Sequence, residues 1–359
     1  MNTLVNNGCL YVHSYLGDMS GVGTIRIMIP HMLLTSYKHK NINFCATYLP
    51  FFVSEISFYK NISIVQFQRS ATEEHLKIIE YFKKNIQSKK YTPIVYEIDD
   101  LLTNIPKWNI AHEYYKNNIN FIEKIMSSVD GMVVSTEPLK EIYSKYNSNI
   151  NVIPNRMPKF LWGNPNPVKE TDKIRIFWGG SSSHFTQKSL MDKGINGGDF
   201  DKNIIDFIIK TRKIYQWVFF GNMPTELIQY KNDIEHHKWV STLEYPFKMK
   251  ELNIDIGIAP LDDNIFNKCK SNLKMLEYIC AGFPGVYSNV YPYQNAHLTS
   301  NNGEEMISHI EKLANDVDFR QKVWNIDRKT IGNDLYWEDS KNLAYYINSY
   351  LNLFNLRLP

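Results

Sequence analysis

Residues 271–290 read SNLKMLEYICAGFPGVYSNV, and this stretch decides the fold. Its first half is an apolar helical pattern that carries a single carboxylate, Glu277. The sequence Ala-Gly-Phe-Pro-Gly comes next and ends the helix, because glycine and proline are poor helix residues. The Val-Tyr-Ser run that follows is typical of a short buried strand. The stretch therefore predicts a helix that leads directly into a strand, with Glu277 on the helix.

The same alternation of short apolar runs and longer amphipathic runs extends in both directions along the chain. It predicts parallel sheets wrapped by helices, an α/β fold of two Rossmann-like doubly wound domains that face a cleft. The expected strands of the first half are 9–16, 42–49, 62–68, 92–100, 131–137 and 149–155, and those of the second half are 173–180, 217–222, 236–241, 255–261 and 285–290. The expected helices include 72–87, 118–129 and most of 303–356.

A break in this pattern divides the chain. MPKFLWGNPNPVKETD has several prolines and no sustained period, so it reads as a linker. We therefore expect an N-terminal domain over 1–157, a linker over 158–172 and a second domain over 173–335. Residues 336–359 are expected to form a helix that packs back on the first domain. Any ligand should lie at the carboxyl ends of the strands, in the cleft between the domains.

Composition and charge narrow the class of protein. The chain has 359 residues, 43% of them hydrophobic, and no run of eighteen apolar residues, so we expect no membrane insertion. The formal charge of +3 does not by itself imply a polyanionic partner. The N-terminus lacks the pattern of a secretory signal, which predicts a cytoplasmic protein, in host cytoplasm if it is viral. The four cysteines have no metal or redox spacing and are expected to be reduced and buried.

The first strand-to-helix junction is rich in glycine. Gly17, Gly21 and Gly23 cluster just before a helical run, where backbone N–H groups can face a phosphate. A plain tight turn explains the cluster equally, and position 26 is Arg26, so the dinucleotide fingerprint G-x-G-x-x-G is absent. Arg26 can reach a diphosphate or be solvated.

The fourth expected strand ends in two carboxylates, Asp99 and Asp100. Neighbouring residues on a strand point to opposite faces, so at most one of the two would face a substrate. They are candidate catalytic groups that position or polarise a hydroxyl. The alternative is that they cap the following segment.

Small polar residues follow the first strand of the second domain. Gly180, Ser181, Ser183 and His184 can hold a phosphate through backbone and side-chain donors, although a lone histidine is more often exposed. The glycine-rich segment 186–201 that follows is expected to be a mobile loop over the cleft or a surface excursion.

The helix of the opening stretch completes the set. Lys270, Lys274 and Glu277 have helical spacing, so all three can share one face. A carboxylate there can accept hydrogen bonds from both hydroxyls of a ribose, and an ammonium near the helix start can neutralise a diphosphate. A surface ion pair of little energetic value is the alternative.

Taken together, these residues resemble the group 1 glycosyltransferases of the GT-B fold, over nearly the whole chain. The resemblance rests on the glycine loop, the Pro-Asn element in NVIPNRMP, the small-residue turn after residue 178 and the block EYICAGFPGVYS. It implies that Glu277 holds the ribose of a nucleotide sugar, a UDP-sugar above all. It also implies that Lys270, Ser271 and Lys274 lie at the donor phosphates, with Lys274 aiding departure of the diphosphate. Transfer is expected to retain the anomeric configuration and to need no metal or other cofactor.

The sequence departs from the family pattern at two places. The family has a second glutamate eight positions before the first, and here that position is Cys269. The family histidine after the fourth strand is also missing, with Glu97, Asp99 and Asp100 in its vicinity. The string VYEIDDLLTNIPKWNIAHEYY resembles a phage-type branch whose relatives include enzymes that glycosylate hydroxymethylated pyrimidines in viral DNA.

The favoured acceptor is therefore hydroxymethylcytosine in phage DNA, with DNA as a partner alongside the nucleotide sugar. Contacts to such an acceptor are expected from Lys107, Trp108 and Arg156, with Lys159, Lys188, Lys193 and Trp162 as further candidates. A solvated face explains each of these residues as well. A lipid-linked or cell-surface saccharide is the alternative acceptor, and a non-catalytic nucleotide-sugar binding module is the second alternative. The oligomeric state is not indicated.

Overall fold

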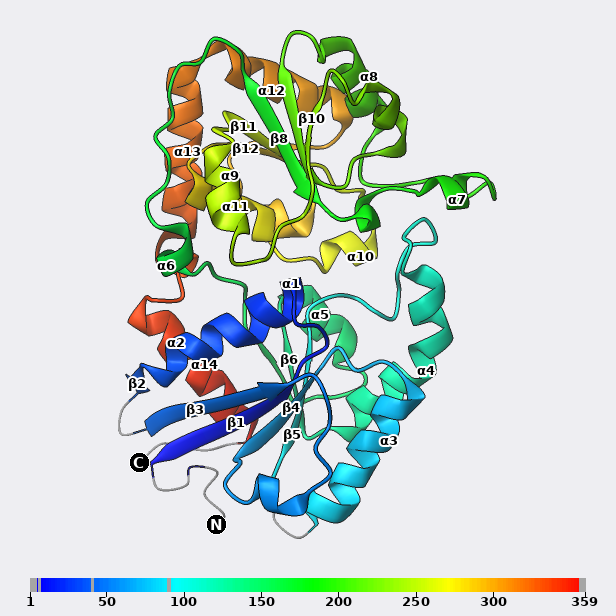
Figure 1. Cartoon of the computed structure of the whole chain (residues 1–359), viewed down its shortest axis with the longest axis vertical. Helices are drawn as coiled ribbons and strands as arrows, with labels where there is room; N and C mark the ends of the chain where they lie inside the picture. Colours follow the sequence, from blue (N-terminus) through cyan, green and yellow to red (C-terminus); the bar gives the residue numbers. More distant parts are fainter. Residues whose placement is uncertain (1–4, 6–7, 40–41, 89–91, 355–359) are drawn as a thin grey trace.

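The computed structural model describes residues 5, 8–39, 42–88 and 92–354. They form two sheets, each covered by helices on both faces (Figure 1). Two apolar clusters pack against the opposite faces of the first sheet, and two others pack against the second. The α/β doubly wound fold predicted from the sequence is confirmed.

The first sheet has seven strands in the order β2-β3-β1-β4-β5-β6-β7, all parallel except β2. The strands are β1 (Cys9–Tyr15), β2 (Lys38–His39), β3 (Ile42–Leu49), β4 (Ile64–Gln68), β5 (Ile94–Ile98), β6 (Gly131–Val134) and β7 (Ile150–Val152). The helices are α1 (Gly21–Gly23), η1 (Thr24–Met28), α2 (Ile29–Thr35), η2 (Ile56–Tyr59), α3 (Glu73–Phe82), η3 (Lys83–Gln87), α4 (His112–Ser128) and α5 (Glu137–Tyr143).

The second sheet has six strands in the order β10-β9-β8-β11-β12-β13. The strands are β8 (Arg175–Gly180), β9 (Gln216–Gly221), β10 (Glu235–His237), β11 (Ile256–Ala259), β12 (Gly285–Ser288) and β13 (Thr299–Ser300). The helices are α6 (Lys159–Trp162), η4 (Ser182–His184), α7 (Lys188–Met191), α8 (Lys202–Thr211), η5 (Thr225–Tyr230), α9 (Tyr245–Glu251), α10 (Ile265–Lys268), α11 (Leu273–Ala281), η6 (Tyr291–Tyr293), α12 (Gly303–Asn315), α13 (Val317–Ile331) and η7 (Gly332–Leu335).

After η7 the chain returns to the first domain, where the last described helix, α14 (Ser340–Leu353), packs on the sheet (Figure 1). Asn149 donates to the Leu353 carbonyl at 2.7 Å, and Asn151 donates to the Ser349 carbonyl at 2.6 Å. The Tyr350 hydroxyl donates to the side-chain oxygen of Gln66 on β4. The first domain is thus built from the two ends of the described chain.

Every strand expected from the sequence overlaps a strand of one of the sheets, whereas β2 and β13 were not expected. Both have two residues, which is too short for a pattern of alternation to be seen. None of the described helices is long and apolar enough to cross a membrane.

The cysteines differ in part from the expectation. Cys9 and Cys45 are joined as a disulfide between the neighbouring strands β1 and β3, so the prediction of reduced thiols is wrong for this pair. Cys45 lies opposite Tyr11 in the register of β1 and β3. Cys9 is two residues before Tyr11, and side chains two residues apart on a strand point to the same face, so both thiols lie on one face of the sheet. Cys269 and Cys280 are free and buried.

The segment around α10 joins the two domains. Phe266 and Cys269 belong to the apolar cluster of the first domain, although they follow a strand of the second sheet. The Thr136 hydroxyl donates to the Cys269 carbonyl at 2.9 Å. Apolar packing and a buried hydrogen bond therefore hold the domains against each other at the side of the cleft where α11 begins.

We expect Phe266→Ala to lower the free energy of unfolding by about 3–5 kcal/mol, because it leaves a cavity in the shared core. The comparison is Ile265→Ala, on the same helix but 45% exposed, which should change stability by less than about 0.5 kcal/mol. Urea unfolding followed by fluorescence measures both. Equal losses in the two variants would contradict the shared core.

Candidate functional site

The site lies where the strand order of the second sheet reverses, between β8 and β11. Ligands of open α/β sheets bind at the carboxyl ends of strands at such a point. Strand β8 ends in Gly179 and Gly180, and a Cβ on Gly180 would lie 2.5 Å from the Trp178 ring. Glycine is required there, and it lets the backbone turn sharply into Ser181, whose hydroxyl meets that of Ser183 at 2.7 Å.

Helix α11 faces this turn. It ends at Gly282, whose φ of 105° gives the left-handed cap expected from the Ala-Gly-Phe-Pro sequence. Lys274 donates to the Gly179 carbonyl, and its ammonium lies 5.2 Å from the centre of the Trp178 ring. Glu277 is buried and accepts a hydrogen bond of 3.4 Å from the Tyr245 hydroxyl. The helix thus presents one cation and one carboxylate at the strand ends.

The ionisation of these two side chains is strongly perturbed. Burial raises the pKa of Glu277 to about 7, against the opposing effects of Lys274 and of the Tyr245 hydrogen bond. Burial likewise lowers the pKa of Lys274 to about 8, and Lys270 adds to the lowering while Glu277 opposes it. Two desolvated groups of opposite sign in one place are typical of a binding or catalytic site. The alternative of a surface ion pair does not fit their burial.

Lys270 and Ser271 precede the helix. Since α11 begins at Leu273, the prediction that Lys270 shares a helical face with Lys274 is wrong. The Lys270 ammonium instead lies 4.6 Å from the centre of the Phe266 ring, still close enough to act on Lys274 electrostatically. The Ser271 hydroxyl accepts a hydrogen bond of 2.9 Å from Asn155.

Arg26 is neither solvated nor turned toward the cleft. It is buried, and its Nε donates to Glu97 at 2.8 Å. Its Nη1 donates to the Ile153 carbonyl at 2.6 Å and to the Asn155 side chain at 2.9 Å. Since Asn155 also contacts Ser271, Arg26 stabilises the junction between the domains. Contact with a donor phosphate stays a prediction.

The glycine loop is fixed by its own chain. A Cβ on Gly23 would lie 1.8 Å from the Asp18 carbonyl oxygen, whereas Gly21 has open space around it. The Gly17 N–H donates to Gln68 at 3.2 Å, and Gln68 donates to Glu97 at 2.9 Å. Gly23 is therefore required by the close approach of the Asp18 carbonyl and not by a ligand. The space beside Gly21 is free for a ligand to approach the backbone.

Asp99 and Asp100 follow the end of β5 at Ile98, so the alternation of a strand does not apply to them. Both carboxylates approach Arg69, at 3.6 and 3.4 Å, and the prediction that they face opposite sides is wrong. Burial raises the pKa of Asp99 to about 7, while Arg69 opposes this shift. A catalytic role for either residue stays a prediction.

The residues expected at an acceptor are spread out. Lys107 is exposed, but Trp108 is buried against Gly197. Arg156 is buried, pairs with Asp334 at 2.8 Å and lines a narrow pocket that also contains Glu277. Trp162 is buried in the core of the second domain, where it offers no stacking surface. The structure therefore separates Arg156 from the loop that carries Lys107 and Trp108.

Two contributors to the site were missed in the sequence. Asp199 lies 15 residues after His184 in the sequence and contacts its ring at 2.6 Å. Tyr245, on α9, donates a hydrogen bond to Glu277. Neither has a local pattern that marks it. His184 itself is buried and not exposed. No group of three or more His, Cys, Asp or Glu side chains in the described ranges could hold a metal ion.

The contact between Gly197 and Trp108 gives a testable prediction. Gly197 has φ of +146°, and a Cβ there would lie 2.4 Å from the Trp108 ring. We expect Gly197→Ala to lower the free energy of unfolding by about 1–3 kcal/mol through strain and the clash with Trp108. Gly194→Ala is the control, because Gly194 also has positive φ but open space around it. An equal loss in both, measured by urea unfolding, would assign the effect to the backbone angle alone.

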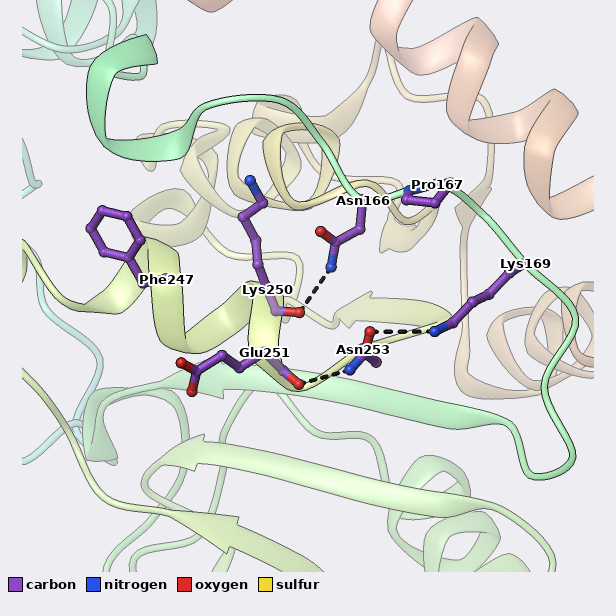
Figure 2. A pocket seen from close by; sticks show the side chains of 7 residues that line it. All are labelled: Asn166, Pro167, Lys169, Phe247, Lys250, Glu251 and Asn253. Atoms are coloured by element: carbon purple, nitrogen blue, oxygen red, sulfur yellow. Dashed lines mark hydrogen bonds between the residues drawn. The ribbon is translucent and has the colours of Figure 1, made fainter.

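A separate hollow of about 470 Å³ lies between the linker and α9 (Figure 2). Its polar groups are largely satisfied by one another. Asn166 donates to the Lys250 carbonyl at 2.8 Å, and Lys169 donates to Asn253 at 3.4 Å. None of the residues predicted for catalysis or binding lines it. The hollow therefore belongs to the framework between linker and second domain and is not a candidate site.

Comparison with known proteins gives a likeness in structure only. No protein-family model matches the chain, and no curated protein matches it. A crystal structure of a point mutant of TarM from S. aureus, in complex with fondaparinux, alpha-GlcNAc-glycerol and UDP, is similar with a TM-score of 0.52 and 14% identity. The likeness covers 84% of this chain and 58% of that one, so the chain spans less than two thirds of TarM.

Os79 from O. sativa in complex with UDP is similar at 9% identity, over 95% of this chain and 99% of that one. The TM-score of this likeness is 0.45. The likeness to TarM confirms that the chain has the GT-B arrangement of two Rossmann-like domains expected from its sequence.

Proposed function

We propose that the chain is a glycosyltransferase that moves a sugar from a nucleotide sugar to a hydroxyl acceptor. The observation that carries this is the pair on α11, in which the buried Glu277 and the half-buried Lys274 lie near the Gly179–Gly180 turn. Glu277 would accept hydrogen bonds from the ribose hydroxyls, and Lys274 would neutralise the diphosphate. Two groups of opposite charge in a desolvated cleft suit a ligand that has hydroxyls at one end and phosphate at the other.

The nucleotide is proposed to be a UDP-sugar. Support comes from TarM, which has the same fold and was crystallised with UDP. Gly180, Ser181 and Ser183 would donate to the phosphates from the turn after β8, beside Lys270 and Ser271. Gly21, which has open space around it, would complete the donor site from the first domain, with Gly23 and Arg26 fixing the loop and the domain junction behind it. These assignments are drawn from residue chemistry and from the resemblance of the sequence.

Departure of the diphosphate would be driven by fixed positive charge. Lys274 and Lys270, which are close enough to act on each other electrostatically, would face the negative charge that develops as the bond to the sugar breaks. Such cations can replace a divalent ion, so we propose metal-independent transfer. Retention of the anomeric configuration is proposed from the sequence resemblance, and polarimetry or NMR of the first product would test it. Asp99 or Asp100 would position the reacting hydroxyl.

The favoured acceptor is hydroxymethylcytosine in DNA. The exposed cations Lys107, Lys188 and Lys193 support this choice, and α7, which carries Lys188, projects from the second domain (Figure 1). They would contact phosphates while Trp108 supports the loop beside them. Arg156 would contact the acceptor only from its pocket beside Glu277.

One experiment tests donor and acceptor together. The protein is incubated with UDP- or GDP-sugars and with DNA that contains cytosine or hydroxymethylcytosine, and nucleoside masses and released nucleotide are measured. A mass gain of one sugar on hydroxymethylcytosine alone is the expected result. Nucleotide release without a mass gain would move the acceptor to a saccharide. Binding of UDP-sugar without release would indicate a binding module.

A further inference from the structure

The chain passes between the two domains twice, and the two passages lie side by side. Met157 and Tyr336 form a parallel bridge there. The Met157 N–H donates to the Leu335 carbonyl at 2.8 Å, and the Trp337 N–H donates to the Met157 carbonyl at 3.0 Å. We refer to residues 156–158 and 335–337 as the hinge, because a rotation of one domain against the other has to take place about these two segments.

A second contact between the domains lies far from the hinge. Helix α6 adjoins the hinge on the left of Figure 1, whereas α7 and the segment that leads into α4 approach each other on the right. There Asn109 donates to the Ser183 carbonyl at 3.3 Å, and a Cβ on Gly197 would lie 2.4 Å from the Trp108 ring. Trp108 and Asn109 are 8% and 3% exposed. We call these four residues the latch.

Each half of the latch is held in shape by its own domain. In the first domain the Asn109 N–H donates to the Pro106 carbonyl at 3.0 Å, and the Asn109 side chain accepts from the Ala111 N–H at 2.9 Å. In the second domain the Thr186 hydroxyl donates to the Gly197 carbonyl at 2.6 Å. The two halves can therefore separate without either of them unfolding.

With the latch formed, there is little room beside Glu277. The pocket that contains Glu277 has a volume of about 30 Å³, which is enough for about one water molecule. Its walls come from both domains, with Ile25 from the first and Tyr245 and Leu273 from the second. Pockets that hold ligands are usually about 300–1,000 Å³. A nucleotide sugar can therefore reach Glu277 only if the two domains move apart.

The latch is the contact that such a separation moves most. In a rotation about the hinge, displacement grows with distance from the axis. Helix α10 lies between the hinge and α7 in Figure 1, so the junction at Phe266 moves less than the latch. The latch consists of one aromatic ring against a glycine and one hydrogen bond, so its loss costs far less than unfolding of either domain. Open molecules are then a minor population of the native state.

We propose that the latch holds the domains closed and that its release admits the donor to Glu277. The inference rests on the proposed function only for the identity of that donor. If closed molecules do not bind UDP, the measured affinity is the affinity of the open protein multiplied by the fraction of open molecules. Weakening the latch should raise this fraction, and fixing the latch should lower it nearly to zero.

Removal of the ring gives the first test. Trp108→Ala should increase the association rate of UDP about 10-fold, because more molecules are open at any moment. Stopped-flow fluorescence of the full chain measures the rate. Ile110→Ala is the matched control, since Ile110 lies in the same segment but is 58% exposed. It should leave the rate unchanged. A rate in Trp108→Ala equal to that of the wild type would overturn the proposal.

A disulfide across the latch gives the second test. Gly197 and Trp108 lie close enough for cysteines at both positions to be joined. Oxidised Trp108→Cys/Gly197→Cys should bind UDP at least about 100-fold more slowly than its reduced form. The two single variants, oxidised and reduced in the same way, control for the Cys9–Cys45 disulfide. Equal rates in the oxidised and reduced double variant would contradict the latch.

The outcomes separate the latch from the function that supplies the donor. Binding of UDP by Trp108→Ala alone would support both. Failure of the wild type and of Trp108→Ala to bind UDP would defeat the proposed donor, and hydrogen exchange without nucleotide then tests the latch. Backbone amides of residues 105–111 and 183–198 should exchange about 10-fold faster in Trp108→Ala than in Ile110→Ala. Equal exchange in the two variants would show that no latch exists.

Discussion

Glu277→Ala is expected to weaken UDP binding about 100-fold or more. Two hydrogen bonds from ribose hydroxyls to a carboxylate contribute about 1.5–3 kcal/mol each, and alanine removes both. Isothermal titration with UDP at pH 8 measures the change, and Glu251→Ala, on the exposed surface of α9, is the control. Normal affinity in Glu277→Ala would disprove the site, provided that its circular dichroism matches the wild type.

The pH dependence of binding follows from the same carboxyl group. Burial raises the pKa of Glu277 from 4.5 to about 7, so the carboxylate that accepts two hydrogen bonds is lost below pH 7. UDP affinity of the wild type should therefore fall between pH 8 and pH 6, and that of Glu277→Gln should not. The raised pKa also means that this group stabilises the fold most below pH 4.5 and that the contribution is lost as pH rises through about 7. Glu277→Gln should consequently melt at a higher temperature than the wild type at pH 8.

Lys274→Met is expected to lower turnover about 1000-fold, because removing one fixed positive group at a leaving anion costs about 10²–10³ in rate. Methionine keeps an unbranched apolar side chain beside Trp178 and removes the charge together with the hydrogen bond to the Gly179 carbonyl. UDP release from UDP-glucose at saturating donor measures it. Burial lowers the pKa of Lys274 to about 8, so its ammonium is lost as pH rises through this value. Turnover of the wild type should therefore fall over the same pH range.

The control for this variant is Lys268→Met, on neighbouring α10, where the exposed ammonium pairs with Asp263 at 2.7 Å. It should leave turnover unchanged. Equal activity of Lys274→Met and the wild type would remove Lys274 from the mechanism. A fall that appears only in KM would instead make it a residue that binds the donor without acting on departure of the diphosphate.

The sequence predicts those parts of the site that are made by local patterns. The glycine pair at the end of β8 and the helix that carries Lys274 and Glu277 each lie within one short segment, where strand period, helix period and glycine act together. The His184–Asp199 pair is different, because a bridge between Phe185 and Gly198 closes it over a long excursion. Arg26 was not predicted to be buried, since its partner Glu97 comes from a strand 71 residues away.

Cys269 shows how tertiary packing changes a position within a recognisable pattern. The resembling family has a glutamate there, but this side chain is fully buried in the core of the first domain beside Phe266. Burial and the nearby Asp100 carboxylate raise the pKa of its thiol to about 12. A glutamate at this place would bury a second carboxylate next to Asp100, at a cost of several kcal/mol in order of magnitude. Under the proposed function, the residue that recognises the sugar must therefore lie at another position.

The return of α14 to the first sheet has a consequence for biosynthesis. Ile347 and Tyr350 belong to the same apolar cluster as Leu10 and Val12 of β1. Domains ordinarily fold as units while the ribosome is still making the next one. Here the first domain stays incomplete, with the part of its sheet that α14 covers exposed, until residues 340–353 have left the exit tunnel. The second domain should therefore fold first, and the nascent first domain should need chaperone protection during translation of nearly the whole chain.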